Sequence, residues 1–176
     1  MQKKLSYNIV LIGFMGTGKS TVSSYLSEKF GMETVEMDQV IEAQEGMTIP
    51  EIFATHGEEY FRDLETQLLI RMQEKKNVVI SCGGGVPLRE RNVREMKKNG
   101  VVVLLDAKPE TVYERIKDNH DRPLLENNMN VEYIAGLMEK RREKYEAAAD
   151  LVLHVDGKSA EEIASELAGR LPAARA

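Results

Sequence analysis

Short apolar runs rich in β-branched residues alternate along the chain with longer segments whose apolar residues recur every three or four positions. This alternation is typical of a parallel sheet whose strands are connected by helices. The runs predict five strands, at residues 8–12, 33–37, 78–82, 101–105 and 151–155. The longer segments predict helices at residues 19–30, 38–44, 50–55, 58–74, 89–98, 109–119, 131–148 and 160–171. We therefore expect an α/β fold built on a five-stranded parallel sheet.

Several predicted helix ends carry a chemical signature. Thr48 and Ser159 each stand three residues before a glutamate, so each can cap a helix start and be capped in return. Gly31, Gly57 and Gly100 follow helical patterns, where a residue in the left-handed conformation often ends a helix. We expect all three glycines to adopt that conformation.

Composition narrows the class of protein. The chain has 176 residues with 24 Lys and Arg against 29 Asp and Glu, a net charge of −5 that disfavours bulk binding to nucleic acid. Cys82 is the single cysteine, so an intrachain disulfide and a cysteine-based zinc cluster are excluded. No apolar run is long enough for a signal peptide or a membrane span. We expect one domain over residues 1–176, acting as a cytoplasmic monomer.

A phosphate-binding motif follows the first predicted strand. Residues 13–20 read Gly-Phe-Met-Gly-Thr-Gly-Lys-Ser, which is the Walker A pattern in its strand-to-helix context. The glycines let successive N–H groups face an anion, and the following helix adds its positive end. Lys19 supplies charge for the β- and γ-phosphates, and Ser20 supplies a hydroxyl ligand for Mg²⁺. The alternative is a glycine-rich turn that binds nothing.

The rest of the chain must show which molecule accepts a phosphoryl group from the bound nucleotide. A guanine-type Asn-Lys-x-Asp sequence does not follow the loop, and there is no room for a second motor domain, so a small-molecule kinase is favoured. Two carboxylates, Glu36 and Asp38, stand two residues apart at the end of the second strand. Ligands bind at that edge of a parallel sheet.

Further motifs appear in a fixed order along the chain: Phe61-Arg62, three glycines at 83–85, Arg-Pro-Leu-Leu at 122–125, and Lys-Arg-Arg-Glu-Lys-Tyr at 140–145. Together with the phosphate loop and Asp38, this set resembles the shikimate kinase family over nearly the whole chain. The resemblance implies a three-layer α/β/α sandwich, ATP and shikimate as substrates, and Mg²⁺ as cofactor. It also implies an acceptor-binding region at about 38–65 and a mobile lid at about 119–130.

The resemblance assigns roles on the acceptor side. Asp38 is similar to the family residue that contacts the acceptor hydroxyl and accepts its proton, although it also stands where a helix N-cap could be. Arg62, Arg141 and the backbone of Gly84 and Gly85 are similar to the group that binds shikimate. From spacing alone Arg62 could be a surface ion pair, and only the resemblance selects Arg141 over its neighbour. Phe53 and Phe61 are candidates either for a ring-binding wall or for simple core.

On the nucleotide side, Arg122 is similar to a lid residue that closes over the phosphates, and Arg115 to one that packs on adenine. Lys19 and Arg122 join Asp38 as catalytic residues. Residues 155–158 are expected beside the adenine. The resemblance thus implies an ATP-binding set of Gly13, Met15, Gly16, Thr17, Gly18, Lys19, Ser20, Thr21, Arg115 and Arg122.

One position departs from the family. Glu36 stands where the family has an aspartate that helps to hold magnesium, so we expect Glu36 and Ser20 to serve the metal, Glu36 directly or through water. Asp106 ends a run that looks like a Walker B strand, but the strand that matches that family position ends at Ser81 and Cys82. We therefore interpret Asp106 as a turn residue and Cys82 as a small buried residue.

Two other functions remain open from the sequence. A related small-molecule kinase, such as a gluconate kinase, would share the phosphate loop and the lid. It should lack the carboxylate-binding set at Arg62, Gly84, Gly85 and Arg141. A regulatory module that binds nucleotide and hydrolyses little would share only the phosphate loop, and it would not need a carboxylate at Asp38.

Overall fold

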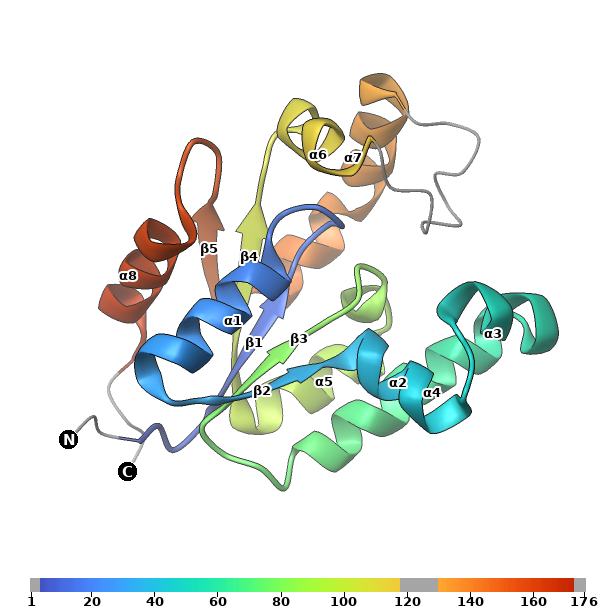
Figure 1. Ribbon diagram of the computed structural model, residues 1–176, viewed down its shortest axis with the longest axis horizontal. Helices are drawn as coiled ribbons and strands as arrows, with labels where there is room; N and C mark the ends of the chain where they lie inside the picture. Colours follow the sequence, from blue (N-terminus) through green and yellow to red (C-terminus); the bar gives the residue numbers. More distant parts are fainter. Residues whose placement is uncertain (1–3, 118–129, 173–176) are drawn as a thin grey trace.

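The computed structural model describes residues 4–117 and 130–172, and its centre is a five-stranded parallel sheet in the order β2-β3-β1-β4-β5 (Figure 1). The strands are β1 (Asn8–Ile12), β2 (Glu33–Glu36), β3 (Val78–Ser81), β4 (Gly100–Asp106) and β5 (Leu151–His154). Every strand runs parallel to its neighbours, and β1 pairs with both β3 and β4. The predicted sheet is confirmed.

Helices cover both faces of the sheet (Figure 1). On one face α1 packs against α8, while α5 and α7 lie behind the sheet and contact β4. The segment α2 to α4 extends beyond β2, and α6 packs on α7. The helices are α1 (Lys19–Phe30), α2 (Met37–Glu45), α3 (Ile49–His56), α4 (Glu58–Met72), α5 (Glu90–Asn99), α6 (Pro109–Ile116), α7 (Val131–Ala148) and α8 (Ala160–Arg170), with a short 3-10 turn η1 (Val86–Leu88). Among these described helices none is long and apolar enough to cross a membrane.

The central strands form the core. All five residues of β1 are buried, and β4 is buried from Gly100 to Leu105, because both faces of these strands carry helices. The edge strands β2 and β5 are partly exposed. The sheet is therefore most rigid under β1, the strand that leads into the phosphate loop.

The helix ends in the structure test the capping residues predicted from the sequence. Thr48 accepts a hydrogen bond from the Glu51 N–H, and the Glu51 side chain returns one, so this capping box is confirmed. Ser159 likewise caps α8 by accepting from the N–H of Glu162. Gly31 is left-handed, as predicted.

Two of the glycine predictions are wrong. Gly57 has a positive φ of 87° but an extended ψ of 168°, so it joins two helices without adopting the left-handed helical conformation. Gly100 is extended and begins β4. A Cβ at Gly100 would lie 2.5 Å from the carbonyl oxygen of Met96 and 2.8 Å from the Val10 side chain. A glycine is needed there because α5 and β1 approach closely.

Candidate active site

The phosphate loop is shaped by glycines that a side chain would block. Gly13, Gly16 and Gly18 all have positive φ angles. A Cβ at Gly13 would lie 2.5 Å from the carbonyl oxygen of Leu105 on the neighbouring strand. The loop then enters α1, whose first residue is Lys19. The positive end of α1 is thus directed at the loop.

The Lys19 side chain binds the backbone of the loop that precedes it. Its Nζ donates to the carbonyl oxygens of Gly13 at 2.7 Å and Phe14 at 3.0 Å. Thr17 is buried, and its hydroxyl donates to the same Phe14 carbonyl at 2.9 Å, so Thr17 supports the loop through its side chain. A positive charge and the N-terminus of a helix therefore lie at one place, as an anionic phosphate requires.

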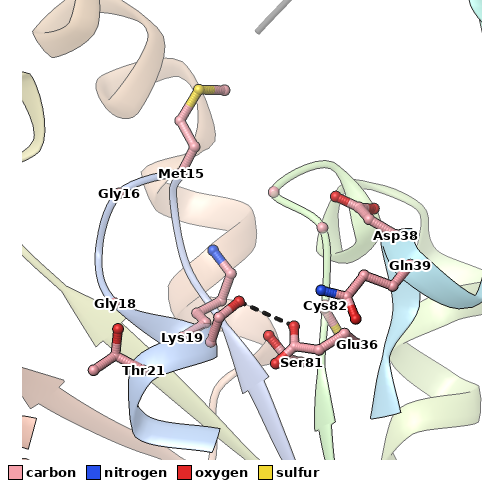
Figure 2. A pocket seen from close by; sticks show the side chains of 13 residues that line it. Met15, Gly16, Gly18, Lys19, Thr21, Glu36, Asp38, Gln39, Ser81 and Cys82 are labelled. Carbon is pink, nitrogen blue, oxygen red and sulfur yellow. Dashed lines mark hydrogen bonds between the residues drawn. The ribbon is translucent and has the colours of Figure 1, made fainter. Parts of the chain in front are cut away.

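A cavity of about 340 Å³ lies in front of the loop, at the carboxyl ends of β1, β2 and β3. Figure 2 shows Lys19 and Asp38 on opposite walls of this cavity, which Gly83 and Gly84 also line. The cavity brings together these predicted site residues: Met15, Gly16, Gly18, Lys19, Ser20, Thr21, Glu36, Asp38 and Gly84. Arg62, Gly85 and Arg141 do not line this cavity, but the two arginines lie against Gly85 and Gly84 of the loop beside it. Thr17 and Arg115 line a second cavity.

Ser20 and Glu36 meet on the floor of the cavity. The Ser20 hydroxyl donates to Glu36 Oε2 at 3.0 Å, which Figure 2 marks with a dashed line. Among the described residues no group of three acidic, histidine or cysteine side chains could hold a metal. A hydroxyl and one carboxylate nevertheless suit Mg²⁺, which takes its remaining ligands from water and from nucleotide phosphates.

Asp38 lies in the first turn of α2, and the N-cap of that helix is Glu36, so the N-cap alternative for Asp38 is wrong. The Asp38 carboxylate lies against the loop after β3: a Cβ at Gly83 would be 3.1 Å from Asp38 Oδ1. Its carboxylate faces the cavity in Figure 2. Asp38 is therefore placed to contact a molecule bound opposite Lys19.

Arg62 projects from α4 into the same loop. It forms ion pairs with the buried Glu65 at 2.8 Å and with the exposed Glu58 at 3.2 Å. Burial lowers the pKa of Arg62, and the two carboxylates outweigh this and raise it. A Cβ at Gly85 would overlap the Arg62 guanidinium. The guanidinium is thus held flat against the Gly85 backbone.

Glu65 is a buried carboxylate beside the cavity that the sequence analysis did not single out. Its side chain is 0% exposed, and a Cβ at Gly83 would lie 3.0 Å from its Oε2. Burial raises the pKa of Glu65 to about 7, with the Asp38 carboxylate adding to the rise and Arg62 opposing it. The charge of Glu65 therefore changes near neutral pH.

Arg141 completes the group from α7. It is only 9% exposed, its guanidinium lies 5.5 Å from the centre of the Phe14 ring, and its Nη1 is 3.1 Å from the position of a Cβ at Gly84. Arg142 instead pairs on the helix exterior with Glu139 at 3.0 Å. The structure thus supplies the reason to choose Arg141, which spacing alone could not.

Each glycine of the 83–85 loop makes room for a different charged group. Gly83 lies against the carboxylates of Asp38 and Glu65, Gly84 against Arg141, and Gly85 against Arg62. A side chain at any of the three would displace its neighbour. The run of three glycines is therefore required by three separate close approaches.

The nucleotide side is bordered by Arg115. Its Nη1 donates to the carbonyl oxygen of Gly16 at 3.2 Å, and it lines a second cavity of about 280 Å³ with Thr21 and Lys158. Asp156 holds the 155–158 loop by accepting from the Lys108 N–H at 3.0 Å and the Thr111 hydroxyl at 2.7 Å. The sequence predicted a loop at residues 155–158 but gave no sign that Asp156 holds it to Lys108 and Thr111. Arg122 and most of the predicted lid lie outside the described residues.

The remaining candidates have structural roles. Cys82 is buried, and burial raises the pKa of its thiol, so the prediction of a small packed residue holds. Asp106 and His154 end β4 and β5 and lie 3.3 Å apart, and both line a separate cavity that Phe14 also lines. Phe53 and Phe61 stack edge to face at 5.1 Å; Phe61 is buried and Phe53 partly so, and both pack in the core.

Comparison with known proteins settles the family. The family model described as shikimate kinase matches residues 15–172. The chain belongs to the shikimate kinase family. It is similar to the shikimate kinase of Persephonella marina, at 48% identity over 93% of this chain and 98% of the relative. It is therefore an ATP-dependent kinase, and the predictions of family, fold and activity are confirmed.

Solved shikimate kinases share the same fold. The Acinetobacter baumannii enzyme in complex with shikimate superimposes with a TM-score of 0.87 at 32% identity, covering 94% of this chain and 96% of that one. The Aquifex aeolicus enzyme gives a TM-score of 0.77 at 39% identity, covering 92% and 93%. Both likenesses cover more than nine-tenths of each chain, and together with the family they favour a kinase over a module that only binds nucleotide.

Proposed function

We propose that the cavity holds Mg-ATP against the phosphate loop and shikimate against the 83–85 loop. The γ-phosphoryl group then passes to the 3-hydroxyl of shikimate and gives shikimate 3-phosphate and ADP. The observation that carries this proposal is that Lys19 and Asp38 face each other across one cavity. A phosphate bound at Lys19 and a hydroxyl bound at Asp38 would be neighbours, and such placement lowers the barrier to transfer.

On the nucleotide wall, the N–H groups of residues 13–18 and the Lys19 ammonium would bind the phosphates. Bound Mg²⁺ would neutralise charge between the β- and γ-phosphates, with Ser20 and Glu36 as its protein ligands, Glu36 directly or through water. The contact between Ser20 and Glu36 supports this assignment. Arg115 would pack on the adenine, since it borders the cavity beyond the loop.

On the acceptor wall, Asp38 would accept the hydroxyl proton as the oxygen attacks phosphorus. Arg62 and Arg141 would bind the shikimate carboxylate, because two guanidinium groups on either side of one loop can each donate to it. Their contacts with Gly85 and Gly84 support this arrangement. Arg122 would close over the phosphates, a role that rests on the motif at 122–125 alone.

A monomer is the proposed working unit. We place the enzyme in the cytoplasm, with no nucleic-acid or membrane partner. The net charge of −5 supports the first exclusion, and the single buried cysteine fits a reducing compartment. Sedimentation at micromolar concentration would test the monomer directly.

The experiment that tests the function is release of ADP from Mg-ATP with one acceptor at a time. Shikimate, quinate, gluconate and nucleoside monophosphates are compared with a blank that holds no acceptor. We expect stimulation by shikimate alone, with product phosphorylated at the 3-oxygen as read by phosphorus NMR. Stimulation by gluconate without shikimate turnover would overturn the acceptor assignment while leaving the phosphate loop in place.

A further inference from the structure

A hydroxyl behind the acceptor wall joins two of its parts. Tyr145 lies one helical turn after Arg141 on α7, and its side chain is nearly buried. Its hydroxyl donates to the carbonyl oxygen of Gly84 at 2.6 Å and accepts from Nη1 of Arg141 at 3.4 Å. One oxygen atom thus contacts both a side chain and a backbone group of the proposed acceptor site.

The bond to Gly84 fixes the direction of a peptide plane. Within the 83–85 loop, the Gly83 carbonyl accepts from the Val86 N–H and the Gly85 carbonyl from the Leu88 N–H, both at 3.2 Å. The Gly84 carbonyl has the Tyr145 hydroxyl as its partner. In a trans peptide the C=O of one residue and the N–H of the next point in opposite directions. Holding the Gly84 carbonyl toward α7 therefore directs the Gly85 N–H away from α7.

The bond to Arg141 limits a flexible side chain. Burial raises the pKa of the Tyr145 phenol, so the hydroxyl keeps its proton at neutral pH and can donate to Gly84 while accepting from Arg141. The Phe14 ring supports the same guanidinium from the phosphate loop. Arg141 is thus oriented before a carboxylate arrives, which lowers the entropic cost of binding.

We propose that Tyr145 is a positioning residue for the acceptor: through one hydroxyl it sets the Gly84–Gly85 peptide and the Arg141 guanidinium in their binding orientation. The inference rests on the proposed acceptor site and adds to it a residue that does not touch the substrate. It predicts that loss of the hydroxyl weakens shikimate binding and leaves ATP binding unchanged.

The test is Tyr145→Phe, which keeps the ring and removes one oxygen. We expect KM for shikimate to rise roughly five- to tenfold, as for the loss of one or two hydrogen bonds. KM for ATP should stay within twofold of the parent.

Two control variants are available. Tyr7→Phe removes a similar hydroxyl bond, from a buried tyrosine to the Pro172 carbonyl at 2.8 Å, far from the site. Lys144→Met removes another bond from α7, to the Leu88 carbonyl at 3.1 Å.

Neither control should change KM for shikimate, although Tyr7→Phe should lower the thermal midpoint about as much as Tyr145→Phe. A rise in both KM values, a shikimate KM within twofold of the parent, or an equal rise in Lys144→Met would overturn the inference.

Arg141→Lys separates this inference from the proposed site. When Arg141→Lys raises KM for shikimate and Tyr145→Phe does not, the acceptor site stands and the positioning role fails. When Arg141→Lys changes nothing, both fail. Where both act, the double variant should lose less than the sum of the two single variants, because the hydroxyl works partly through that guanidinium.

Discussion

The two walls of the cavity are built in different ways. The proposed nucleotide wall comes mainly from one segment of eight residues, 13–20, in which backbone groups and one lysine would bind the phosphates. The proposed acceptor wall takes Asp38 from α2 into the cavity lining, and Arg62 from α4 and Arg141 from α7 lie against the 83–85 loop beside it. A contiguous segment can form its site by local geometry alone. The dispersed wall depends on how four parts of the chain pack, so small packing changes should affect it first.

The largest effect should come from Asp38, the acceptor-wall group that we propose takes part in the chemistry. Asp38→Asn keeps the shape of the side chain and removes the base, so kcat should fall roughly 10²- to 10⁴-fold while the ATP dissociation constant stays unchanged. Steady-state kinetics and calorimetric ATP titration measure the two. Asp63→Asn, at an exposed aspartate that pairs with Arg89, is the matched control. A kcat within tenfold of the parent would remove Asp38 from the mechanism.

The second effect concerns pH and the buried carboxylate of the acceptor wall. In the folded protein the pKa of Glu65 is raised to about 7, above its ordinary value of 4.5. The folded state therefore holds a proton that the unfolded state has released between these values. The resulting stabilisation is complete below about pH 4.5 and is lost as the pH rises through 7.

Glu65→Gln cannot titrate, so the parent should lose about 2 to 3 kcal/mol of unfolding free energy relative to this variant between pH 5 and pH 8. Urea unfolding at several pH values measures it. A difference between the two proteins that does not vary with pH would show that Glu65 stays charged throughout.

A third substitution tests the role of the 83–85 loop. Gly85 has a φ of −86°, which alanine adopts freely, so Gly85→Ala should act only by displacing Arg62. We expect KM for shikimate to rise roughly tenfold, as for a weakened bond to a charged group. Gly136→Ala is the control, because a Cβ there meets nothing within 4 Å on helix α7 and should stabilise the fold slightly. Unchanged kinetics in Gly85→Ala would mean that Arg62 does not bind the acceptor.

The smallest effect is expected on the nucleotide wall. Glu36→Gln retains an oxygen that can accept from Ser20 but removes the charge near the proposed metal. The Mg²⁺ concentration for half-maximal rate should rise several-fold to about tenfold. Glu33→Gln, at the other end of β2, serves as control. Equal magnesium dependence in Glu36→Gln and Glu33→Gln would show that Glu36 does not hold the metal. Ser20 would then be the one proposed protein ligand that remains.

The same contrast explains what the sequence could predict. The strands and the phosphate loop could be read directly, because burial on both faces and a strand-to-helix motif leave local patterns; β1, α1 and α7 have the predicted bounds. Gly100 could not be read, because its role comes from the approach of Met96 and Val10 across the fold. Arg141 and Arg142 are adjacent and chemically alike. Only the packing of α7 on Phe14 distinguishes them.

The hydrogen bond from Tyr7 to Pro172 joins the two ends of the described chain. Tyr7 directly precedes β1, so this junction lies at the amino ends of the strands, opposite the cavity at their carboxyl ends. A fluorophore, affinity tag or surface tether attached near either residue would leave both substrate openings facing solution. Immobilised enzyme could then report binding of each substrate separately, without competition from the surface.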